Sequence, residues 1–159
     1  MKNTPPDGSI RIGIIKHRFR THPESYCVSY NYSPVVEVKG IPWSGSVSLA
    51  NNREIGTSIE CQLVKTMKWS IDMDAEFILV NSDPSKNHVV QDSYNFRPGD
   101  YPVGKMKNCS TLITDDALID PAKGFINGET FTIEIRFWIT KMRGLRINQL
   151  TDFTDPNDP

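Results

Sequence analysis

The strongest constraint on the fold is a period-two alternation of apolar and polar residues that recurs along the chain. Between residues 69 and 79 the odd positions are apolar and most even positions are polar. The odd set is Trp69, Ile71, Met73, Ala75, Phe77 and Leu79. Successive side chains of a strand point to opposite faces, so this pattern predicts a strand with one buried face and one face in water.

The same alternation predicts further strands. It is clear in the segments 41–49, 59–63 and 131–139, and weaker in 10–19 and 26–32. In 10–19 the apolar phase changes after Ile14, which predicts a bulge or bend there. Clusters of turn-forming residues separate the strands at 50–53, 81–84, 97–100 and 127–128.

One short helix interrupts the strands at residues 114–121. Thr114 or an adjacent Asp can cap its first N–H groups, and Pro121 discourages its continuation. Seven to eight strands, short turns and one short helix predict an all-β fold, a two-layer antiparallel β-sandwich. We assign Trp43, Trp69 and Phe77 to its core, and we expect Cys61 to be a small buried residue.

The length and the net charge of the chain limit its number of domains and its classes of partner. The 159 residues predict one domain, with a flexible N-terminus at 1–9, the sandwich at 10–140 and a linker-like acidic tail at 141–159. The net charge is −1, and three acids without a base lie in the last nine residues. A nucleic-acid or membrane-surface partner would favour a clear basic excess, so neither is expected.

The residues that could perform chemistry form no recognisable site. The three histidines and three cysteines show no metal-binding spacing, and no nucleophile or phosphate-loop motif occurs. We therefore expect no enzyme, no metal and no cofactor. With no apolar leader and no long apolar run, the sequence predicts a soluble protein of the cytoplasm or nucleus.

Several stretches in sequence order resemble the MATH domain, the meprin and TRAF-C homology sandwich. IKHRF at 15–19 is similar to its opening strand, and YSP at 32–34 followed by VKGIPW at 38–43 resembles a run of nematode members. WSI at 69–71 with AEFILVN at 75–81 forms a second match. DALIDPAKGFI at 116–126 leading into FTIE at 131–134 is the most specific.

This resemblance implies a module that binds a short extended peptide of a partner protein along a strand edge. Many nematode members precede a BTB domain and act as the substrate-recognition arm of cullin-type ubiquitin ligases. The tail at 152–159 resembles the linker into such a domain. The chain is then either a fragment of a longer adaptor or a free-standing MATH protein.

The resemblance also implies a peptide groove near residues 94–106. Tyr94 matches the family's groove aromatic, whereas either 100–104 or 106–109 can stand for the strand that follows it. Phe96 fits either the groove or the core. The predicted peptide-binding residues are Tyr94, Phe96, Asp100, Tyr101, Val103 and Met106.

Two other classes of function stay open at this stage. The first is an architectural or oligomerising TRAF-like module without a ligase role. The second and less favoured is an enzyme, which would need a cleft with convergent titratable groups.

Overall fold

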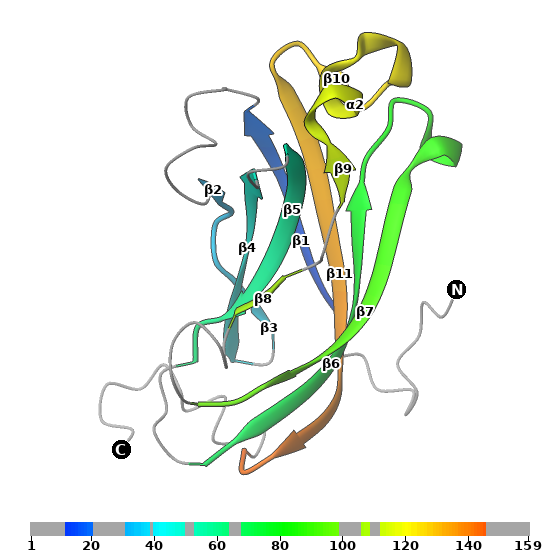
Figure 1. Cartoon of the computed structure of the whole chain (residues 1–159). Coiled ribbons are helices and arrows are strands. Elements are labelled where there is room, and N and C mark those ends of the chain that lie inside the picture. Colours follow the sequence, from blue (N-terminus) through cyan, green and yellow to red (C-terminus); the bar gives the residue numbers. More distant parts are fainter. Residues whose placement is uncertain are drawn as a thin grey trace.

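Two antiparallel sheets packed face to face make up the fold, seen in the computed structural model of the chain (Figure 1). The structure describes residues 12–20, 31–38, 40–49, 53–63, 68–98, 106–108 and 112–145. The predicted all-β sandwich with one short helix is confirmed. The described residues contain eleven strands, more than the seven or eight expected, because several strands are only two or three residues long.

The first sheet has five strands in the order β1-β11-β6-β7, with β10 paired to the beginning of β11. We call it sheet A. Its strands are β1 (Ile12–Arg20), β6 (Ser70–Leu79), β7 (His88–Phe96), β10 (Ile126–Asn127) and β11 (Thr130–Arg143).

The second sheet, sheet B, has the order β2-β4-β5-β8, with β3 paired to β4 and β9 paired to β5. Its strands are β2 (Asn31–Tyr32), β3 (Val36–Val38), β4 (Ile41–Leu49), β5 (Glu54–Cys61), β8 (Met106–Asn108) and β9 (Ile113–Thr114). Among the described residues, three short helices lie in the connections: η1 (Pro84–Lys86), α2 (Asp115–Ile119) and η2 (Pro121–Lys123).

The core lies between the sheets and consists of the apolar phase of each long strand. The odd positions of β6 and β11 from Ile71 to Leu79 and from Phe131 to Ile139 are all buried. Trp43 of β4 is fully buried, and its ring centroid lies 5.1 Å from that of Phe96 and 5.3 Å from that of Phe137. The assignments of Trp43, Trp69, Phe77 and Cys61 to the interior are confirmed.

The bulge predicted near Ile14 is wrong. β1 pairs with β11 residue for residue from Ile12 to Arg20. Ile15 and Phe19 face the core, whereas Ile14 faces outward and is 51% exposed. The apolar pattern in the sequence changes phase after Ile14 because Ile12 and Ile14, on the outward face of β1, are apolar as well. The irregularity in this sheet lies instead in β11, between Ile139 and Lys141.

The predicted short helix is confirmed as α2. Thr114 is its N-cap, and its hydroxyl oxygen accepts a hydrogen bond from the backbone N–H of Ala117 at 3.3 Å. Asp115 in the first turn is paired with Arg53, which ties the helix to the beginning of β5. Pro121 begins η2 instead of extending α2.

Two predicted boundaries can be compared with the structure only in part: the strand at 26–32 and the end of the sandwich at residue 140. The predicted strand at 26–32 is described only at β2, because residues 21–30 lie outside the described residues. The last strand runs on to Arg143, past the expected domain end at residue 140, and Leu145 still packs in the core.

Truncation of Phe96 tests this core directly. Phe96→Ala should lower the free energy of unfolding by about 3–5 kcal/mol, because it removes a fully buried ring between the two sheets. The volume-conserving Phe96→Leu should cost about 1.5 kcal/mol or less. Urea denaturation followed by tryptophan fluorescence measures both. A loss below about 1 kcal/mol for the alanine variant would place Phe96 outside the core.

Candidate functional site

The candidate site is the edge of the sandwich formed by β7 and β8. Within the described part of the chain, β7 pairs only with β6, and β8 only with β5. At the other side β1 contacts β3 and β4, which brings those two sheet edges together. β7 and β8 therefore end their sheets at the opposite edge, with β7 on the right of Figure 1 and β2 on the left.

Tyr94 lies on the inward face of β7, at the mouth of the core. It is paired with Met73 of β6 and is half-buried. Its ring makes an edge-on contact with Phe77, with centroids 6.2 Å apart, and lies 6.4 Å from the ring of Phe96. The tyrosine thus packs on the core, its hydroxyl oxygen is buried, and only part of the residue is exposed.

The other predicted contact residues are placed differently. Phe96 is fully buried against Trp43, so its side chain is not at the surface, and we assign it to the core instead of the groove. Met106 begins β8, and its backbone lies opposite Glu60 of β5. Asp100, Tyr101 and Val103 lie outside the described residues. The structure thus brings Tyr94 and the backbone of Met106 to one edge.

A polar network fixes β7 in the sheet next to Tyr94. The carboxylate of Asp72 on β6 accepts hydrogen bonds from Asn95 at 2.6 Å and from Arg143 of β11 at 3.0 Å. Asn95 and Arg143 both donate to the Ser70 hydroxyl as well, each at 3.1 Å. The network therefore links three adjacent strands on the outward face of sheet A.

These contacts change the acidity of Asp72. The hydrogen bond from Asn95 is the largest cause that lowers the pKa of Asp72, and the hydrogen bond and charge of Arg143 and the charge of Lys141 act in the same direction. Burial opposes them and is the weaker influence overall, so the pKa lies below its ordinary value.

The described residues contain neither a metal-binding cluster nor a membrane-spanning helix. No group of three or more His, Cys, Asp or Glu side chains among them could hold a metal ion. No helix in the same residues has the length and apolar character needed to cross a membrane.

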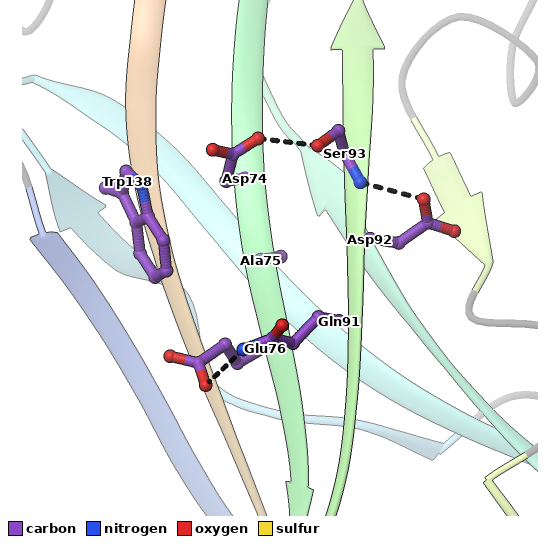
Figure 2. A pocket seen from close by; sticks show the side chains of 7 residues that line it. All are labelled: Asp74, Ala75, Glu76, Gln91, Asp92, Ser93 and Trp138. Atoms are coloured by element: carbon purple, nitrogen blue, oxygen red, sulfur yellow. Dashed lines mark hydrogen bonds between the residues drawn. The ribbon is translucent and has the colours of Figure 1, made fainter. Parts of the chain in front are cut away.

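One surface feature was missed by the sequence analysis. Trp138 stands on the outward, mostly polar phase of β11, next to Asp74 and Glu76 of β6, and these residues line a hollow on sheet A (Figure 2). The available signal was the indole itself, because it is a large apolar group at an even position of a strand whose odd positions form the core.

Comparison with known proteins decides the family. A family model described as the MATH domain matches residues 28–139, which is most of the chain and includes the β7–β8 edge. The chain belongs to the MATH domain family. MATH domains are protein–protein interaction modules without catalytic activity, and they bind protein partners. No curated protein matches the sequence.

The pH dependence of stability tests the network of Asp72. Its pKa is lowered in the folded state, so its stabilising contribution is complete above the unfolded-state pKa of about 3.9 and is lost as the pH falls through the folded-state value. Asp72→Asn should therefore lose less stability than the wild type on acidification from about pH 5.

Urea denaturation at a series of pH values measures this difference. Asp116→Asn is the matched control, since Asp116 is exposed on α2 and lies far from the network. Its acid-induced loss should equal that of the wild type. Identical acid profiles for Asp72→Asn and the wild type would show that the ionised form of Asp72 does not stabilise the folded state.

Proposed function

We propose that this MATH domain binds a short extended segment of a partner protein at the β7–β8 edge. The observation that carries the proposal is the free edge of β8, which pairs with β5 on one side only among the described residues. Unpaired backbone N–H and C=O groups of an edge strand can form a ladder with an incoming strand. Backbone pairing supplies affinity, and pockets for alternate side chains supply specificity.

Tyr94 is the side chain best placed to contact such a segment. It belongs to the strand that borders the same edge, and its ring is supported from behind by Phe77 and Phe96. A tyrosine held in this way loses little conformational entropy on binding, because its orientation is already set by packing. Asp92 is exposed two residues away on the same face of β7 and adds a negative charge beside the tyrosine.

Peptide selection followed by NMR tests the binding edge. Random peptides displayed on phage are selected on the domain, and a selected peptide is then titrated into the isotope-labelled chain. The backbone amide signals of residues 92–96 and 106–108 should shift. Shifts confined to β1, β2 and β3, at the far edge of the sandwich, would contradict the proposal.

Substitution of Tyr94 tests its role in the same titration. Tyr94→Ala should weaken binding of the selected peptide about tenfold or more, because it removes a packed aromatic contact. Tyr94→Phe, which keeps the ring, should bind within a few-fold of the wild type. Unchanged affinity of a folded alanine variant would remove Tyr94 from the site.

We further propose that the bound segment belongs to a substrate of a BTB/cullin-type ubiquitin ligase, and that the domain acts in the cytoplasm or nucleus. Support comes from membership of the MATH family and from the resemblance of the tail at 152–159 to a linker into a BTB domain. The full reading frame tests this role. A BTB domain encoded beyond residue 159 is expected, and a different domain there would contradict the ligase role while leaving peptide binding intact.

A further inference from the structure

The outward face of sheet A carries a second surface, separate from the β7–β8 edge. Strand register places its side chains in rows across the sheet. One row contains Ile12, Trp138, Asp74 and Ser93, and the next contains Ile14, Arg136, Glu76 and Gln91. The β1 side of these rows is apolar, and the β6 side is acidic.

Two adjacent hollows lie over these rows. The larger, of about 360 Å³, is lined by residues 74–76 of β6, 91–93 of β7 and Trp138. The smaller, of about 100 Å³, is lined by Ile12, Ile14, Glu76, Arg136 and Trp138. Figure 2 shows Trp138, Asp74 and Glu76 around the larger hollow, with the Asp92 carboxylate on the other side of β7. Trp138 and Glu76 border both hollows.

The carboxylates on this face differ in whether a basic side chain is paired with them. Asp72 is paired with Arg143 at 3.0 Å, and Glu134 is paired with Arg136 and, at 3.9 Å, with Lys16. From the described residues, Asp74 and Glu76 receive only neutral donors, the Ser93 hydroxyl at 2.6 Å and the Gln91 amide at 3.1 Å. Among the described residues that line the larger hollow none is basic.

Glu76 is the more buried of the two carboxylates. It is only 1% exposed although it lies on the outward face of the sheet. Arg136 stands opposite Glu76 in the strand register, but its Nε–H is donated to Glu134. No described residue forms an ion pair with Glu76, so an incoming cation would supply a charge-assisted hydrogen bond that this carboxylate lacks there.

The surface also has an exposed apolar part. Ile14 is 51% exposed and lies beside Ile12 and Trp138 across the smaller hollow. Trp138 borders both hollows and is 7% exposed, so only a small part of its indole is open to a ligand. That part attracts cations as well as apolar groups. The two hollows together suit a ligand with both kinds of group.

We propose that this face docks a second polypeptide segment, one that presents an arginine or lysine side chain flanked by apolar side chains. The cation lies in the larger hollow against Asp74, Glu76 and the indole of Trp138. A neighbouring apolar side chain covers Ile12 and Ile14. The partner is a basic, apolar segment because the larger hollow is lined by three acids and by no basic residue among those described. This docking does not require strand addition at β8.

Titration with defined peptides tests the proposal. The probes are acetyl-Gly-Leu-Arg-Leu-Gly-amide and its counterpart with Glu in place of Arg, added to the isotope-labelled full chain. The arginine peptide should shift the Trp138 indole N–H signal and the amides of residues 74–76 and 91–93 saturably. The glutamate peptide should not.

A double substitution isolates the two carboxylates. Asp74→Asn/Glu76→Gln should weaken binding of the arginine peptide about tenfold or more, because charge-assisted contacts are lost. The matched control Asp116→Asn/Glu37→Gln makes the same change in net charge at exposed positions of α2 and β3, and it should bind like the wild type. An indole spectrum that matches the wild type establishes that each variant is folded.

Several results would overturn the proposal. These are no shift at residues 74–76 and 91–93, equal shifts with the glutamate peptide, and equal loss in the two double variants. Shifts that appear only at residues 106–108 would also overturn docking at the hollows, while they would agree with peptide binding at β8.

Discussion

The packing of Trp43 between Phe96 and Phe137 is the contact on which the remaining structure depends. Trp43 belongs to sheet B, whereas Phe96 and Phe137 belong to β7 and β11 of sheet A. All three rings are fully buried. A single cluster therefore fixes the edge strand β7 relative to sheet B, and the spacing of the two sheets at the binding edge follows from it.

The two proposed recognition surfaces use opposite faces of the same strand, β7. At its edge, β7 contributes Tyr94 from its inward face, where the ring continues the aromatic core to the surface. On its outward face, β7 contributes Gln91 and Ser93, which donate to the carboxylates of Glu76 and Asp74. Because inward and outward side chains alternate, neighbouring residues of one strand serve two separate surfaces.

The sequence predicts the parts of the fold that burial controls. The alternation in β6 and β11 identifies the core side chains, and Thr114 identifies the beginning of α2. Alternation fails at β1, where apolar residues occupy both faces and Ile14 points outward. It also fails for Phe96, since a period-two pattern does not tell the interior from a groove that borders it.

The candidate site is predictable only in part, because the strands that form it are short. β8 and β9 have three and two residues, too short for a periodic pattern, and their place in sheet B depends on backbone hydrogen bonds to β5 that any sequence can make. Tyr94 was found through a family resemblance. Trp138 was missed although its indole stands at an even position of β11, because the hollow beside it is formed by residues of β6 and β7 that adjoin it only in three dimensions.

Amide hydrogen exchange at β8 tests the central claim most directly. The free chain and the chain saturated with a selected peptide are compared at residues 106–108. If the peptide adds as a strand, the amides of β8 that point away from β5 should become protected in the complex. If these amides exchange at the same rate in both states while the peptide is bound, strand addition at this edge is contradicted.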